Sequence, residues 1–232
     1  MNKHAAAITL LQNHSLPSLV QQQLENMILA GTFAPGSQLT EIPLAAQLGV
    51  SRGPIREAFR GLEEKGLVRV EKNRGVFVRT ISPTEANEIY EVRAALEELI
   101  VKKLAATPLK VAAAKIDLML VKTEKLAVKG DFAACHAANM AFHDTLATLT
   151  GNTTLLDAYR RLVGELSLFR HQAHAHIPDA SSLRASVTDH QAILAAIIAG
   201  DTRTATRLIR AHLEASRKRL QALLDSAPVS PQ

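Results

Sequence analysis

The feature that most constrains this chain is a change of pattern at residue 82, after which no strand periodicity appears in the sequence. Ser82 and Glu85 have the spacing of a capping box, and Pro83 suits the first position of a helix. Beyond this point, apolar residues recur at helical spacing between short breaks. The predicted helices lie at about residues 83–106, 108–129, 132–150, 153–175, 186–199 and 202–225. Residues 83–225 are therefore expected to form an all-helical bundle.

The composition agrees with closely packed helices. Hydrophobic residues make up 47% of the 232 residues, aromatic residues only 3%, and there is no tryptophan. The apolar content therefore comes mostly from alanine, leucine, isoleucine and valine, which favour helices that pack closely. This composition excludes a disordered, collagen-like or disulfide-stapled protein, and the single Cys135 fits a reducing compartment.

The sequence predicts no membrane anchor. The longest apolar run, Ala192 to Ala199, is too short to span a bilayer. Residues 1–11 lack a cleavage site, so we interpret them as a frayed terminus rather than a signal peptide. Residues 226–232 are expected to form a disordered tail. We therefore expect a cytoplasmic protein with no membrane partner.

Residues 1–80 are organised differently from the bundle. One helix begins near Pro17, and Thr40 and Ser51 stand where the next two helices would be capped. Residues 68–78 alternate valine with charged residues on either side of an Asn-Arg-Gly turn, which predicts a β-hairpin. Three short helices followed by a hairpin is the order of a winged helix-turn-helix domain.

The third of these helices carries arginines along one face. Arg52 and Arg56 are four residues apart, and Arg60 continues the stripe one turn later. Arg74 lies beside Gly75 at the hairpin tip, where a wing could touch the neighbouring groove of DNA. Arginine can hold guanine or phosphate with two parallel hydrogen bonds. A face rich in arginine is also often no more than a solvated surface, so charge alone leaves both interpretations open.

The positive charge gathers in the same segment. The net charge is +5 and the pI is near 9.5. Eight basic and four acidic residues lie between Arg52 and Arg79, the densest basic patch of the chain. The basic excess therefore lies where the nucleic-acid motif lies.

The segment LAAQLGVSRGPIREAFRGLEEKGLVRVEKNRGVFV resembles the DNA-binding domain of GntR-type bacterial transcription regulators. The resemblance implies that Arg52 and Arg56 contact double-stranded operator DNA, and that Gly75 lets the wing approach the minor groove. Ile42 stands where some relatives carry an arginine, so Thr40 or another group would have to anchor the DNA backbone. We predict a homodimer on a pseudo-palindromic operator. The expected DNA-contacting set is Thr40, Ser51, Arg52, Arg56, Arg60, Arg74 and Gly75.

Several histidines of the bundle have spacings that fit a metal site. Asn139 and His143 are four residues apart and share one helix face. His190 and His212 flank the turn at residues 200–201, and in an antiparallel helix pair both would lie roughly 15–16 Å from it. These side chains could then converge inside the bundle. The alternative is that each histidine is an ordinary buried or surface residue bonded to a neighbour.

The other histidines of the bundle carry weaker signals. His136, seven residues before His143, could also line the cavity, but we expect it to be a core or rim residue. His171, His174 and His176 lie together before Pro178, where histidine suits the negative end of a helix dipole. We interpret that run as a solvated face.

The bundle resembles the FCD domain, the ligand-binding domain of the FadR-type branch of the same family. The matching stretches are EVRAALEELI, NMAFHDTLATLTGN, DHQAILAAIIAGD and the alanine and His-Leu pair at residues 211–213. Many relatives have aspartate where this chain has Asn139. The resemblance implies a divalent metal, with zinc preferred over nickel or manganese, held by Asn139, His143, His190 and His212.

Arg93 matches an arginine on the first helix of the FCD domain. The resemblance implies that it binds a small anionic effector, an organic acid by default, between its guanidinium and the metal. The alternative is a simple ion pair with Glu97, four residues later on the same helix.

Together these observations predict a mainly α protein with a winged helix-turn-helix domain over residues 1–80 and an FCD-like helical bundle over residues 83–225. We expect a DNA-binding transcriptional regulator, a repressor, and not an enzyme. A metal-dependent hydrolase using the three histidines is the alternative, although the sequence has no nucleophile elbow, phosphate loop or HExxH motif. An architectural protein whose bundle only dimerises is a third possibility.

Overall fold

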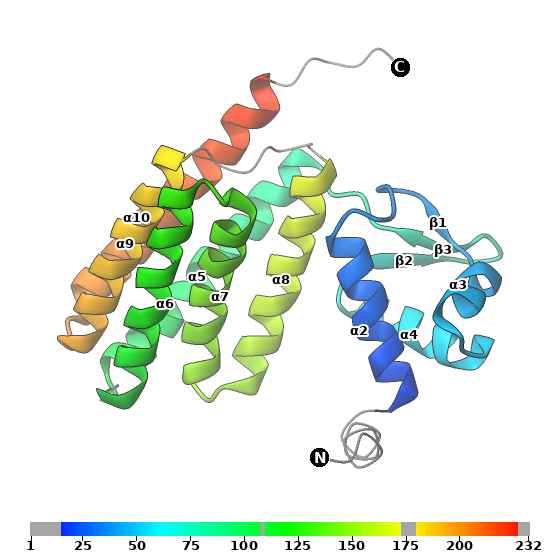
Figure 1. Ribbon diagram of the computed structural model, residues 1–232, viewed down its shortest axis with the longest axis horizontal. Coiled ribbons are helices and arrows are strands. Elements are labelled where there is room, and N and C mark those ends of the chain that lie inside the picture. The colour runs from blue at the N-terminus through cyan, green and yellow to red at the C-terminus, as the bar shows by residue number, and fades with distance from the viewer. Residues whose placement is uncertain (1–14, 108–109, 173–179, 227–232) are drawn as a thin grey trace. The chain divides into compact units, whose positions relative to one another are not determined.

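The computed structural model describes residues 15–107, 110–172 and 180–226 (Figure 1). The chain forms two compact units. The first comprises Met1–Ser82 together with Gly164–Gln172, and the second comprises Pro83–Val163 together with Ala173–Gln232. The predicted frayed terminus and all but the first residue of the predicted tail lie outside the described residues.

The N-terminal part of the first unit has the predicted order of helices and hairpin. Its helices are α2 (Leu16–Leu29), α3 (Glu41–Leu48) and α4 (Arg52–Glu64). Its strands are β1 (Gln38–Leu39), β2 (Val68–Glu71) and β3 (Gly75–Val78), and they form an antiparallel sheet in the order β1-β3-β2. The sequence did not predict β1, because two residues are too few to show an alternating pattern.

Helix α4 is positioned by one apolar face. Ile55, Phe59 and Leu62 recur at helical spacing and are buried, and α4 packs against α2 and α3. Gly49 ends α3 in a left-handed conformation with φ of 66°, which a glycine adopts without steric cost. Burial of one face leaves the opposite face of α4, with Arg56, exposed to solvent.

The hairpin of β2 and β3 turns at residues that favour a positive φ. Asn73 has a φ of 61° and Gly75 a φ of 110°. Val68 pairs with Val78 and both are buried. The alternation predicts Val70 on the same face as Val68, yet Val70 is 49% exposed.

The remaining described elements are helices, as the sequence predicts. They are α5 (Pro83–Ala105), α6 (Lys110–Lys129), α7 (Phe132–Leu149), α8 (Thr153–Gln172), α9 (Ala180–Ile198) and α10 (Thr202–Ser226). The predicted architecture, a mainly α chain in which short helices and a hairpin precede a helical bundle, is confirmed. Helix α9 begins six residues before the predicted residue 186, since no proline or glycine interrupts it after residue 179.

The second unit buries both apolar and polar side chains. Helix α5 packs against α10, α9 and α7, and α6 packs against α7 and α9 (Figure 1). Ile100, Phe142 and Ile193 belong to its core. Polar residues are also buried in this unit, and five of them set up the site described next: Arg93, Glu97, His143, His190 and His212. None of the described helices is long and apolar enough to cross a membrane.

Candidate nucleic-acid interface and candidate metal centre

Two arginines of α4 share a single carboxylate. Nε of Arg52 donates to Oε2 of Glu41 at 2.8 Å, and Nε of Arg56 donates to Oε1 at 2.7 Å. Both arginine side chains are more than half exposed. Glu41 was not predicted as part of this surface, because it lies on α3 and precedes the arginines by 11 and 15 residues. Only the packing of α3 against α4 brings the three groups together.

The electrostatics of this cluster follow from its ion pairs. The hydrogen bond from Arg56, joined by that from Arg52, lowers the pKa of the Glu41 carboxyl below its usual value of 4.5. The same hydrogen bond raises the pKa of Arg56. These shifts favour the charged forms of Glu41 and Arg56, and the carboxylate holds two guanidinium groups on one exposed surface.

The wing presents two further arginines. The guanidinium carbons of Arg69 and Arg74 each lie 5.7 Å from the centre of the Phe77 ring, within cation–π range. Both arginines also pair with Glu71, at 2.9 and 2.5 Å. Arg69 was missing from the predicted DNA-contacting set. Its alternation with buried Val68 could have placed it on the exposed face of the strand.

The other predicted DNA-contacting residues also lie on the surface of the N-terminal unit. Thr40 and Ser51 precede α3 and α4, and neither side chain makes a capping hydrogen bond with its helix. Arg60 is exposed one turn after Arg56. Ile42, where some relatives carry an arginine, is 69% exposed in the first turn of α3.

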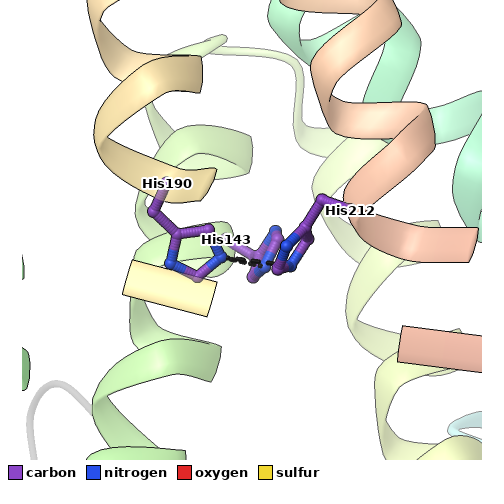
Figure 2. Close-up of side chains that lie close together, drawn as sticks. All are labelled: His143, His190 and His212. Atoms are coloured by element: carbon purple, nitrogen blue, oxygen red, sulfur yellow. Dashed lines mark hydrogen bonds between the residues drawn. The ribbon is translucent and has the colours of Figure 1, made fainter. Parts of the chain in front are cut away.

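The second unit brings three histidines together from three helices. His143 comes from α7, His190 from α9 and His212 from α10, and Figure 2 shows their rings pointing toward one another. Nε2 of His190 lies 3.1 Å from Nε2 of His143 and 3.2 Å from Nε2 of His212. All three side chains are buried. The equal spacing of His190 and His212 from the intervening turn correctly predicts that they meet.

Carboxylates contact two of these rings at Nδ1, the ring nitrogen that does not face the other histidines. Oε2 of Glu97 lies 2.6 Å from Nδ1 of His143, and Oδ2 of Asp189 lies 3.1 Å from Nδ1 of His212. An ionised carboxylate only accepts hydrogen bonds, so each Nδ1 carries the proton. The Nε2 atoms of His143 and His212 then offer lone pairs to the centre of the cluster. Spacing along the sequence predicts neither contact, since it pairs Glu97 only with Arg93.

Burial disfavours the charged form of two of the three histidines, His143 and His190. It lowers the pKa of His190 well below 6.5, and the neighbouring His143 and His212 lower it further. Burial also lowers the pKa of His143, although Glu97 opposes that shift. For Glu97, burial acts to raise the pKa, but His143 and Arg93 outweigh it and hold the pKa at about 2. At neutral pH, uncharged rings of His143 and His190 therefore lie beside the ionised carboxylate of Glu97.

The donor set fits a divalent metal ion. The three histidine ligand atoms lie within 4.8 Å of one another. Two nitrogens bound to a tetrahedral zinc ion at about 2.1 Å would lie roughly 3.4 Å apart, close to the separations seen here. Oδ1 of Asn139, one helical turn before His143, is buried without a hydrogen-bond partner. A neutral amide oxygen is a suitable additional ligand.

Arg93 lies next to this cluster and is itself buried. Its Nε donates to Oε1 of Glu97 at 2.7 Å, and both side chains are almost completely enclosed. The ion pair that the sequence offers as the alternative for Arg93 is therefore present. It also links Arg93 to His143, because Glu97 bonds both residues.

The structure does not test the predictions for the other histidines of the bundle. His174 and His176 lie outside the described residues. His136 lies on α7 and His171 on α8, and the placement of their side chains is not described. The predictions for these four residues stay predictions.

Comparison with known families decides the class of the protein. The model of bacterial regulatory proteins of the gntR family matches residues 17–78, and the FCD domain model matches residues 88–215. The chain belongs to the GntR family and carries an FCD domain. This confirms the resemblance seen in the sequence. A GntR-family chain of this type is a transcriptional regulator that binds operator DNA and responds to a small molecule, and it is not an enzyme.

Individual relatives support this assignment. The GntR-family chain is 30% identical over 205 residues to a protein of Paenarthrobacter nicotinovorans named "Probable D-xylose utilization operon transcriptional repressor", and the match covers 88% of each chain. It is 29% identical to the Uxu operon transcriptional regulator of Escherichia coli, over 87% of this chain and 85% of that one. A solved GntR regulator from Rhodococcus sp. RHA1 is 28% identical, with a TM-score of 0.71 over 93% of this chain and all of that one.

Proposed function

We propose that this protein is a homodimeric, cytoplasmic repressor whose hold on its operator is controlled by a small carboxylic acid bound in a metal-containing FCD domain. Residues 1–80 would bind the DNA, and residues 83–225 would bind the effector and form the dimer. The observation that carries the proposal is the convergence of three histidine Nε2 atoms beside a buried arginine. The repressor assignment is supported by the printed name of the Paenarthrobacter relative.

The DNA-reading surface is proposed from exposure and charge. Arg52 and Arg56 occupy the exposed side of α4, whose other side is anchored in the core. The N-terminal turn of such a helix can enter the major groove, where arginine reads guanine. Arg74 and Gly75 at the wing tip would reach the adjacent groove, while Thr40 and Ser51 would offer backbone N–H groups to phosphates.

The metal site is proposed for His143, His190 and His212, with Asn139 as the oxygen ligand. When bound, the ion would supply a Lewis-acidic position for one oxygen of the effector. Neutral nitrogen ligands at this spacing suit zinc first, with nickel or manganese as alternatives. The hydrolase alternative is not supported, because the family and the relatives are regulators.

Arg93 is proposed as the anchor for the effector's negative charge. Its guanidinium is charged at any physiological pH, since Glu97 and its surroundings raise its pKa despite burial. Glu97 occupies the Nε side of the guanidinium. Arginine has five N–H donors, so an anion can bind another edge of the same group.

The dimer is supported by apolar side chains that the isolated chain leaves exposed. Val92 and Leu99 lie seven residues apart on α5, on one face, and are 53% and 44% exposed. Light scattering on the purified chain checks the dimer: a mass near 50 kDa, twice the 25.1 kDa of one chain, is expected. A mass of one chain at micromolar concentration would contradict it.

A thermal-shift panel tests the effector and the metal together. The full chain is heated with each of a set of small carboxylates and phosphonates, with added zinc or with a chelator. A ligand at 100 times its dissociation constant stabilises by about 2.7 kcal/mol, which is several degrees for a domain of this size. We expect at least one acid to raise the melting temperature with zinc and less with chelator. No shift with any acid, or shifts that ignore the chelator, would contradict the proposal.

A further inference from the structure

Glu97 lies between a cation and a histidine and bonds both. Its Oε1 accepts from Nε of Arg93 at 2.7 Å, and its Oε2 lies 2.6 Å from Nδ1 of His143. The side chains of Arg93, Glu97 and His143 are 4%, 3% and 1% exposed. The carboxylate is therefore fixed at both oxygens and has no room to change partners without breaking a buried ion pair.

We propose that Glu97 is a positioning residue for the metal site: held by Arg93, it fixes the tautomer and ring orientation of His143 so that Nε2 faces the other two histidines. This inference rests on the metal site proposed above. A histidine that binds a metal through Nε2 must carry its proton on Nδ1, and a partner for that proton sets both the tautomer and the ring plane.

The composition of the site gives Glu97 a second role. The proposed ligands are three imidazoles and the amide of Asn139, and all of them are neutral. In this chain the buried negative charge beside the cluster comes from Glu97, one hydrogen bond away from His143. Through His143, it makes the site more attractive to a cation.

Asp189 gives a natural comparison within the same site. It lies 3.1 Å from Nδ1 of His212, a longer contact than that of Glu97, and its side chain is 45% exposed. Water can replace an exposed carboxylate as the acceptor for the Nδ1 proton. Glu97, enclosed beside Arg93, has no such substitute. Removing the Glu97 carboxylate should therefore lower zinc affinity more than removing the Asp189 carboxylate.

The first test observes the tautomers directly in the unaltered protein. The full chain, labelled with nitrogen-15 in histidine and freed of metal, is examined by long-range proton–nitrogen NMR at about pH 7.5, above the ordinary histidine pKa of ~6.5. The signals of His143 are assigned by their loss in His143→Gln. We expect His143 to carry its proton on Nδ1. A proton on Nε2 of His143 would overturn the proposal, whatever the variants show.

The second test measures zinc affinity in Glu97→Gln. An amide oxygen can still accept from His143, but the amide NH2 then faces the Arg93 guanidinium, which also only donates. The variant therefore loses one of the two bonds. In competition with a chromophoric chelator, we expect zinc affinity to fall about 10–100-fold. Zinc affinity should fall less in Asp189→Asn than in Glu97→Gln.

Glu98→Gln is the matched control, because Glu98 is the next residue on α5 and accepts instead from Nε of Arg210 at 2.7 Å. Its zinc affinity should match that of the unaltered chain. Equal affinity in Glu97→Gln and Glu98→Gln would overturn the role of Glu97 while leaving the metal site intact. Absence of zinc binding in the unaltered chain would instead refute the metal site itself. If Glu97→Gln does not fold, as circular dichroism reveals, the tautomer measurement decides.

Discussion

In each of the two units, a carboxylate of the candidate site bonds two basic side chains. In the N-terminal unit, Glu41 bonds Arg52 and Arg56 on an exposed surface. In the FCD domain, Glu97 bonds Arg93 and His143 inside the helical core. The hydrogen-bond distances in the two clusters are alike, between 2.6 and 2.8 Å. The two clusters differ in their exposure to solvent: the arginines bonded to Glu41 are exposed, and the side chains around Glu97 are buried.

That difference sets what each cluster can do. Exposed ion pairs are weak because water and salt screen them, so a DNA phosphate or guanine can take over the arginines at little cost. A buried pair is costly to break, because the group left behind keeps an uncompensated charge in the core. The Glu41 cluster is thus suited to exchanging partners, and the Glu97 cluster to holding a geometry.

The largest effect is expected from breaking the buried cluster. Arg93→Ala leaves Glu97 buried without its cation, and we expect the free energy of unfolding of the FCD domain to fall by about 3–5 kcal/mol. Arg210→Ala, which removes an exposed partner of Glu98, is the control and should leave stability unchanged. Urea denaturation followed by circular dichroism measures both. Equal free energies of unfolding in the two variants would contradict the claim that breaking the buried cluster costs more stability than breaking an exposed ion pair.

The second-largest effect is expected on the affinity of the N-terminal domain for DNA. Duplexes selected by the unaltered chain from a random pool serve as the probe. We expect Arg52→Ala and Arg56→Ala each to weaken binding to the selected duplex by about 5- to 150-fold and to relax its sequence preference. Arg160→Ala, which removes an exposed arginine that bonds Asp144 in the second unit, should bind as before. Unchanged binding in both α4 variants would exclude α4 as the reading helix.

A smaller effect is expected from Glu41→Gln. The substitution removes a negative charge beside two arginines and releases their orientation. We expect affinity for a scrambled duplex to rise about two- to five-fold, the scale of an exposed ion pair, and preference for the selected duplex to fall. Fluorescence anisotropy with both duplexes measures this. A fall in affinity for both duplexes alike would show that Glu41 supports the fold of the domain rather than its selectivity.

The sequence predicted most of the fold because the elements are marked by local signals. Gly49 and Gly75 adopt the positive φ values that their turns require, and Pro83 starts α5. The start of α9 was placed six residues late because the segment before residue 186 has no marked boundary. The strand β1 was missed because two residues are too few to show an alternating pattern. Its pairing with β3 also joins residues that are almost forty positions apart.

In the candidate sites too, features set by local spacing were predicted, and contacts between separate helices were not. The meeting of His190 and His212 follows from helix geometry and one turn, so spacing predicts it. The contacts of Glu41 with the α4 arginines, and of Glu97 with His143, depend on how separate helices pack. No periodicity within one helix contains that information. Sequence reasoning therefore predicted that the histidines meet and missed the carboxylates that contact them.

The central claim is that the FCD domain controls how the N-terminal domain holds DNA. The direct measurement is the dissociation constant of the zinc-loaded chain for its selected duplex, with and without the acid that gives the largest melting shift. A coupling of about 1–3 kcal/mol predicts a change of roughly 5- to 150-fold. The same dissociation constant with the acid bound and without it would contradict the account.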